Sequence, residues 1–425
     1  FVLPIFFIQT FLGQFSSTGF ISVFRISPIF KGIAYVIVAL NIVAACINAV
    51  GASYSLVYFF ASFSPTFNVI CICIFSIGVL NSPEYNFDTL RMAWLVLGAS
   101  IVTWYIIISN LQVTHFLRYS AIAIVSILLL IFLRVVCLPG SMNGLKEFVF
   151  KGFKVANIMQ TLKGSPIMAL SHFGTGWGVV LTMASHNNFK ANVYKNALVV
   201  TLSLICLGTI AGLTVFLIDG YLQEHLYLDI NHFDVYPIRF LFLGFPYFFG
   251  NIEASNMWSL LFFLMLALCE LNVIILFATM TSLFDEYEYL RIYKKQISMI
   301  LPAVLFVVSI VFMTDHDNKT LWTLFAGKFY ICLYCIFDYA IMERLHINIL
   351  VKIVIETIKF LPWLFILAYV VIKVIGTSGN IKARFKRCVM PHDWYPADAA
   401  DRLRYEETFG NMIAVSIFVI LKFCY

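Results

Sequence analysis

Apolar runs long enough to cross a lipid bilayer recur along this sequence, and they constrain its fold more than any other feature. A transmembrane helix needs about 20 mostly apolar residues in a row. Of the 425 residues, 61% are hydrophobic and only 12% are charged, whereas soluble domains carry about 25% charged residues. Because too few charges remain to cover a water-exposed surface, a soluble globular fold is excluded. The sequence predicts an all-α polytopic membrane protein with about ten spans.

Gly, Pro and charged residues separate these runs and set the expected spans. The first span is expected to end near Phe24. We expect residues 1–378 to form the transmembrane domain and residues 379–425 to form a cytoplasmic tail with a short apolar end. The other expected spans are 32–63, 92–109, 115–138, 167–185, 197–219, 258–283, 299–313, 321–342 and about 353–375.

Basic residues predict the orientation of the chain, because Lys and Arg are retained on the cytoplasmic side of a membrane. The basic segments 25–31, 190–195 and 291–295 fall on one side when the expected spans are counted in turn. That side is predicted to be cytoplasmic. The opposite side then carries Asn318, which begins an Asn-Lys-Thr glycosylation sequon.

The same count conflicts with the basic cluster at residues 382–387, which it places on the outer side. A cluster of this kind belongs on the inner side. Either one span is missing between residues 342 and 360, or the last expected span does not cross.

Three glycines at every second position interrupt the expected span 167–185. Residues 171–178 read Ser-His-Phe-Gly-Thr-Gly-Trp-Gly. Glycine weakens a helix, and a helix broken at membrane depth would direct free backbone groups at a polar ligand, as in many secondary transporters. Alternatively, the glycines let neighbouring helices pack closely. Both interpretations stay open from spacing alone.

Glu270 lies near the middle of the expected span 258–283. Insertion scales give about 2.5–3.5 kcal/mol for an acidic side chain at that depth, so its default interpretation is functional. The alternatives are a structural pair with Lys328 or a neutral, protonated carboxyl group. Asn41 and Asn48 are also polar groups at membrane depth, but uncharged amides more often join helices by hydrogen bonds than bind substrate.

The sequence does not predict an enzyme. It contains no HExxH, no GxSxG, no P-loop and no spaced set of Cys and His residues. The net charge of +6 is small and does not suggest nucleic acid as a partner. The expected partners are the lipid bilayer and a small solute, and a homo-oligomer is left open.

Five motifs together point to one family. They resemble segments of the neurotransmitter:sodium symporters. The second span of that family with its first inner loop is similar to residues 13–33, the end of its fifth span to residues 134–144, and the loop after its sixth span to residues 184–198. The end of its eighth span is similar to residues 285–286, and its cytoplasmic tail to residues 391–405. The insect nutrient amino-acid branch is the most similar. This resemblance implies an inverted-repeat fold of the LeuT type, here incomplete, because the first span and the eleventh have no counterpart in the sequence.

The resemblance also implies a function and a set of site residues. It implies a sodium-coupled symporter of amino acids or related amines in the plasma membrane, which works by alternating access and usually also binds chloride. His172 takes the place of a Ser that serves sodium and chloride at the first ion site. The implied ligands of the second sodium site are Ala267, Glu270 and Asn272. The implied substrate-binding residues are Asn48, Ser171, Phe173, Gly174, Gly176 and Trp177.

Two departures from the family pattern affect the ion sites. Leu204 replaces an ion-binding Asn, and Leu271 replaces a Ser of the second sodium site. Hard cations require several oxygen ligands, and these side chains supply none. We therefore expect weak or absent sodium binding at the first site. The alternatives to symport are a non-transporting, degenerate paralogue or fragment, and a proton-linked carrier that uses Glu270.

Overall fold

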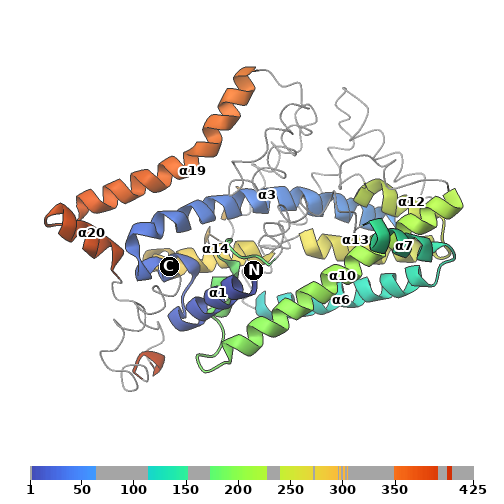
Figure 1. Ribbon diagram of the computed structural model, residues 1–425, viewed down its shortest axis with the longest axis horizontal. Coiled ribbons are helices and arrows are strands. Elements are labelled where there is room, and N and C mark those ends of the chain that lie inside the picture. Colours follow the sequence, from blue (N-terminus) through green and yellow to red (C-terminus); the bar gives the residue numbers. More distant parts are fainter. Residues whose placement is uncertain are drawn as a thin grey trace.

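A computed structural model describes ten stretches of the chain, and every regular element in them is helical (Figure 1). The expected spans 92–109 and 321–342, almost all of 299–313, and Asn318 lie outside the described residues. The described residues are 2–63, 113–151, 173–226, 240–270, 273–294, 296–297, 300–301, 304, 349–390 and 400–403.

The first apolar run forms a shorter helix than expected. Helix α1 is Val2–Ser16, and three short helices follow it, α2 (Phe20–Val23), η1 (Phe24–Ile26) and η2 (Pro28–Phe30). The prediction that this span ends near Phe24 is therefore wrong. Hydropathy cannot detect the stop, because it is made by Ser17 in a left-handed conformation, with φ of 51°, and apolar residues resume after it.

Three long helices occupy the positions expected from hydropathy. Helix α3 is Lys31–Ala61, α6 is Val113–Val136 and α10 is Val193–Leu226. The short helix α7, Ser141–Lys151, packs closely along α10, where Gly144 faces Gly220. These close approaches depend on glycine, because a side chain at either position would overlap the facing backbone.

The expected span 258–283 is built from two helices in line, α13 (Ser255–Glu270) and α14 (Val273–Glu286), and the short α15 (Glu288–Ile292) follows. Helix α3 runs alongside both (Figure 1). At one end of the bundle, Tyr58 of α3 stacks on Phe263 with ring centroids 4.8 Å apart. There a π-helical turn, η5 (Phe240–Gly244), and α12 (Phe245–Gly250) complete an aromatic core.

The last described helices stand apart from this bundle. Helix α19, Ile349–Gly376, contacts α3 and η2, and α20, Ile381–Val389, bends away from its end by 119°. Because α20 also contacts η2, its basic residues lie at the same end of the bundle as residues 25–31. In the conflict noted above, this contact favours placing residues 382–387 with residues 25–31 over the placement given by the span count.

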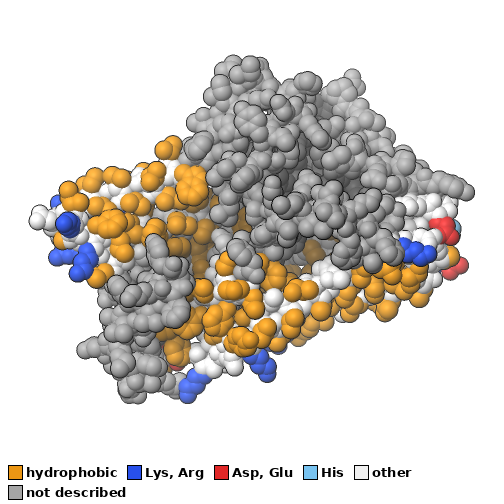
Figure 2. Space-filling model, in the orientation of Figure 1, with side chains coloured by type: hydrophobic (Ala, Val, Ile, Leu, Met, Phe, Trp, Pro, Cys, Tyr) orange, Lys and Arg blue, Asp and Glu red, His pale blue; other side chains and the backbone are white. Residues whose placement is uncertain are grey.

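Apolar side chains cover much of the surface that the described residues present in this view (Figure 2). Among the described residues, four helices are long and apolar enough to cross a membrane, or five if α19 and α20 together form one bent span. One of the four is the combined segment Ser255–Glu286. The lipid-facing character predicted from composition is thus visible on the folded chain.

Candidate functional site

Residues 173–178, the glycine segment, are not helical. Gly174, Gly176 and Gly178 adopt positive φ angles of 67°, 92° and 73°. The regular structure resumes at α9, Val179–Ala184, which packs against α1. L residues other than glycine rarely adopt this conformation. The predicted interruption of the span is therefore confirmed for the part of 171–178 that the structure describes.

The three glycines meet different surroundings. A Cβ atom added to Gly178 would lie 2.5 Å from the ring of Phe20, whereas one added to Gly174 or Gly176 would find no atom of the described residues within 4 Å. Gly178 therefore has the close-packing role of the alternative interpretation. Gly174 and Gly176 instead turn the backbone where no described residue packs against them.

Asn41 of α3 holds the glycine segment against α14. Its Nδ2 donates to the carbonyl oxygen of Trp177 at 3.0 Å and to Oγ1 of Thr279 at 2.9 Å. The residue is only 1% exposed, and its Oδ1 has no hydrogen-bond partner in the part of the chain that the structure describes. A buried oxygen of this kind usually has a partner. It thus offers an acceptor beside a backbone carbonyl at the break.

Glu270 lies midway along the segment Ser255–Glu286, as expected, and its side chain is partly buried. It forms no hydrogen bond or ion pair with any residue in the described stretches. The stacked pair Tyr58 and Phe263 fixes the level of α13 against the antiparallel α3. Glu270 lies seven residues after Phe263 on α13, so it is level with Gly51, which lies seven residues before Tyr58 on α3. Gly51 and Asn48 are three residues apart on α3, which is less than one helical turn of about 5.4 Å.

The remaining implied site residues are distributed as follows. Asn48 is partly buried on α3, and Ala267 is buried on α13, one turn before Glu270. Phe173 packs edge-on against Phe6 of α1, with ring centroids 6.2 Å apart. Leu204 is 37% exposed on α10. Ser171, His172, Leu271 and Asn272 lie outside the described residues.

Sequence reasoning did not find the polar contacts that anchor the chain between α1 and α3. The backbone N–H of Gly19 donates to Oδ2 of Asp285 at 2.8 Å, and that of Phe20 donates to Oγ of Ser282 at 2.9 Å. Thr182 of α9 also accepts from Phe20 at 3.3 Å. No spacing rule relates residues this far apart in the sequence, although the paired acids 285–286 were a visible signal.

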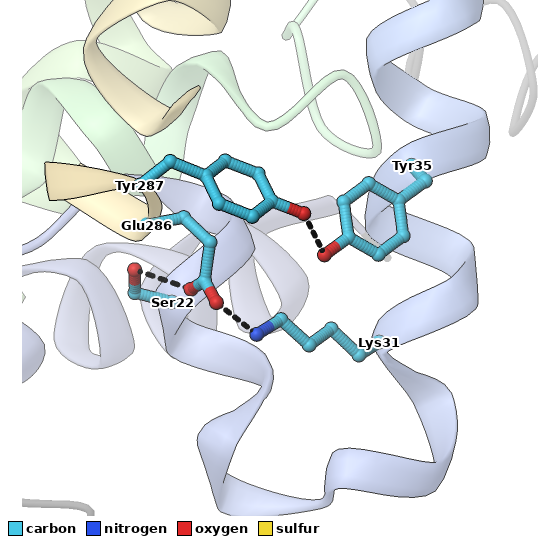
Figure 3. Close-up of polar contacts among 5 residues, drawn as sticks. All are labelled: Ser22, Lys31, Tyr35, Glu286 and Tyr287. Carbon is cyan, nitrogen blue, oxygen red and sulfur yellow. Dashed lines mark hydrogen bonds and ion pairs between the residues drawn. The ribbon is translucent and has the colours of Figure 1, made fainter. Parts of the chain in front are cut away.

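Five residues at the end of α14 form a further polar group, the Glu286 cluster (Figure 3). Glu286 pairs with Nζ of Lys31 and accepts a hydrogen bond from Oγ of Ser22 at 3.1 Å. Next to it, the hydroxyl groups of Tyr35 and Tyr287 lie 2.7 Å apart. Both oxygens of the Glu286 carboxylate thus have partners, in contrast to those of Glu270.

The chemistry of these groups suits a monovalent cation better than a transition metal. Within the described stretches, no three His, Cys, Asp or Glu side chains come together. A hard cation is bound by oxygen atoms, and the bundle offers two separate oxygen groups, the carboxylate of Glu270 and, about three helical turns away along α3, the amide oxygen of Asn41.

Comparisons with known proteins agree on the relationship. The curated relatives include glycine transporter 1 of Xenopus laevis, described as sodium- and chloride-dependent, which is 25% identical over 342 residues, 67% of this chain and 53% of the relative. The sodium-dependent serotonin transporter of Drosophila melanogaster is 25% identical over 351 residues, 73% of this chain and 56% of the relative. The chain therefore spans about half the length of the curated relatives it matches.

A solved structure supports the fold. The crystal structure of MhsT in complex with L-phenylalanine superposes with a TM-score of 0.53, 15% identity and coverage of 86% of this chain and 87% of that one. This match shows the LeuT-type fold expected from the sequence. The sequence model described as the sodium:neurotransmitter symporter family matches residues 1–76 and 74–425. The chain therefore belongs to the sodium:neurotransmitter symporter family.

Proposed function

We propose that the full-length protein is a sodium-coupled symporter of amino acids or related amines in the plasma membrane, and that it works by alternating access. The observation that carries this proposal is the pairing of a broken crossing with an unpartnered carboxylate. Trp177 of the glycine segment is hydrogen-bonded to Asn41 of α3, and Glu270 lies at the end of α13, which packs along the same helix about three turns further on. Secondary transporters place their substrate and ion sites at such a break near the bilayer midplane.

In this proposal each group has a separate role. Glu270 and the carbonyl oxygen of Ala267 bind sodium, together with Asn272. Gly174 and Gly176 leave space for the substrate, whose polar ends meet backbone groups of the segment, and Phe173 and Trp177 border its apolar part. Asn48, Ser171 and His172 complete the substrate and first ion sites, and chloride is a further co-transported ion.

Family membership supports transport, and the local geometry supports Glu270 as the ion ligand. A carboxylate at membrane depth is unfavourable by about 2.5–3.5 kcal/mol on insertion scales unless an ion, a partner or water meets it. Because no partner is present among the described residues, an ion from solution is the group best suited to it. Lys328, the alternative structural partner of Glu270, lies outside the described residues; at Glu286, by contrast, Lys31 and Ser22 occupy the carboxylate.

Uptake into proteoliposomes tests the proposal. The full-length protein would be reconstituted with an imposed sodium gradient and given radiolabelled glycine, L-phenylalanine or serotonin, the solutes for which its relatives and structural neighbour are named or with which they were solved. We expect uptake of at least one solute that requires the gradient and falls about tenfold or more in Glu270→Gln. Glu253→Gln, at an exposed loop position, is the matched control and should transport normally.

Two results would contradict the proposal. Equal uptake in sodium and potassium, with a dependence on a proton gradient that Glu270→Gln abolishes, would assign Glu270 to proton-linked transport. Absence of uptake of any tested solute, from folded and oriented full-length protein, would favour the non-transporting alternative.

A further inference from the structure

Helix α20 presents an exposed apolar stripe that no part of the chain covers among the described residues. Ile381, Phe385 and Val389 recur at four-residue spacing and therefore share one face of the helix. Ile381 is 80% exposed and Phe385 is 54% exposed. In a soluble setting such a stripe would be unfavourable, and a helix with this pattern is typical of a membrane surface.

Basic side chains flank the stripe and have no acidic counterpart on α20. The helix contains Lys382, Arg384, Lys386 and Arg387, and no Asp or Glu. By helical geometry Lys382 and Lys386 follow directly beside the apolar stripe on one side. Neither lysine forms a hydrogen bond or an ion pair with another described residue. Their charges are thus available to an outside partner, in contrast to those of the two arginines.

The two arginines fix the angle at which α20 leaves α19. Arg384 donates to the carbonyl oxygens of Gly379 and Ile375, and Arg387 donates to the carbonyl oxygen of Ser378 at 3.2 Å. On the same side, Sγ of the buried Cys388 lies 3.3 Å from Oγ1 of Thr377. The bend of 119° between α19 and α20 is therefore held by specific contacts.

The stripe continues the lipid-facing surface of α19. Ile372 and Ile375, in the last turns of α19, are both exposed, and α19 is one of the apolar helices that qualify as part of a span. Figure 2 shows hydrophobic side chains along α19, with Lys and Arg side chains gathered at the end where α20 follows. The apolar surface thus continues from α19 onto α20, and the Lys and Arg side chains begin at the same point of the chain.

We propose that α20 lies in the membrane interface and binds anionic phospholipid headgroups, with its apolar stripe among the upper acyl chains and Lys382 and Lys386 at the headgroups. Charge complementarity selects an anionic surface over a zwitterionic one. The contact of α20 with η2 places it at the end predicted to be cytoplasmic, and anionic lipids are enriched in that leaflet. Each lysine near such a surface contributes about fivefold in affinity, which corresponds to about 1 kcal/mol.

Hydrogen exchange in lipid nanodiscs tests this proposal without requiring transport. The full chain would be placed, one copy per disc, in discs of phosphatidylcholine alone and in discs that also contain phosphatidylserine. We expect amide exchange over residues 381–390 to be slower by about fivefold or more in the anionic discs, because α20 is held at the surface there. The Lys382→Gln/Lys386→Gln variant should lose this difference.

The matched control is Lys190→Gln/Lys195→Gln, which removes the same charge from two exposed positions elsewhere and should keep the difference. All four lysines are exposed, so both variants should fold, and unchanged exchange over α3 would verify it. Equal exchange in the two lipids would overturn the proposal. Protection that appears only with two copies per disc, whatever the lipid, would overturn it in favour of a second copy of the chain as the occupant.

Discussion

The Glu286 cluster and the middle of the bundle both contain a carboxylate, but only the carboxylate of the Glu286 cluster has partners among the described residues. In the Glu286 cluster the carboxylate is paired with Lys31 and Ser22. In the middle, Glu270 and Oδ1 of Asn41 have no partner in the described parts of the chain. Because unpaired buried polar groups are unfavourable, they persist where something else binds them. The comparison indicates that the Glu286 cluster stabilises the fold, and it is consistent with the proposal that the middle binds a ligand.

Removal of the Glu286 carboxylate should have one of the two largest effects on stability. In Glu286→Ala, Lys31, whose side chain is only 17% exposed, loses its ion pair and Ser22 loses its acceptor. Loss of one partner of a buried pair is unfavourable by about 3–5 kcal/mol, so for this partly buried pair we expect a decrease of about 2–4 kcal/mol in the free energy of unfolding. Denaturant unfolding in detergent micelles would measure it.

The matched control for that variant is Arg291→Gln. The Arg291 side chain is 64% exposed and lies 3.4 Å from Asp285, and exposed pairs contribute about 0–1 kcal/mol. Equal losses in the two variants would contradict a structural role specific to the Glu286 cluster.

Alanine substitutions in the glycine segment should distinguish a glycine that packs against a neighbour, Gly178, from one that meets no described neighbour, Gly176. Both Gly178→Ala and Gly176→Ala place a side chain at positive φ, which is unfavourable by about 1–2 kcal/mol. Only Gly178→Ala also overlaps Phe20, which is fully buried, and overpacking adds about 1–3 kcal/mol. Unfolding measurements should therefore show the larger loss for Gly178→Ala. If Phe20→Leu fails to restore part of it, the overlap is not the cause.

Substitution of Asn41 should have an intermediate effect. Asn41→Leu keeps a similar volume but removes both hydrogen bonds, to Trp177 and to Thr279. Each such bond contributes about 0.5–1.5 kcal/mol, so we expect a loss of about 1–3 kcal/mol in unfolding free energy. Ser120→Ala, which removes a local hydrogen bond of α6, is the control and should cost about 1 kcal/mol or less. Full stability of Asn41→Leu would indicate that the Asn41 bridge does not hold the break in place.

Glu270→Gln should have the smallest effect, and of the opposite sign. Because no partner is lost within the described stretches and a charge is removed from membrane depth, we expect the unfolding free energy in sodium-free buffer to stay within about 1 kcal/mol of wild type, or to rise. A loss as large as that of Glu286→Ala would show that Glu270 has a structural partner, and the comparison between the two carboxylates would fail.

Hydropathy predicted the long helices well, and its errors have local physical causes. Helix α10 was expected to end at Asp219 but continues to Leu226, because the buried Asp219 accepts a hydrogen bond from Gln223, one turn later, at 2.9 Å. The helix begins at Val193, and Oδ1 of Asn192 accepts from the N–H of Lys195 at its first turn. A charged side chain that has a hydrogen-bond partner within the helix lowers the local hydropathy, so hydropathy alone predicts a helix end at that residue.

The candidate site was predictable only in part. The glycines and Glu270 stand out in the sequence, because both are unusual at membrane depth. The role of Asn41 could not be predicted, since an amide in an apolar run is as consistent with a helix contact as with a ligand site. Nor could spacing distinguish Gly178, which packs on Phe20, from Gly174 and Gly176, which border open space. These distinctions depend on neighbours more than a hundred residues away.

Sodium-dependent stability tests the central claim most directly, because it needs no knowledge of the substrate. The thermal unfolding midpoint of the full-length protein would be measured in sodium chloride and in potassium chloride at equal ionic strength, for wild type, Glu270→Gln and Glu253→Gln. A bound ion stabilises the folded state by mass action, so sodium should raise the midpoint of wild type and Glu253→Gln but not that of Glu270→Gln. A sodium effect that persists unchanged in Glu270→Gln would contradict the account.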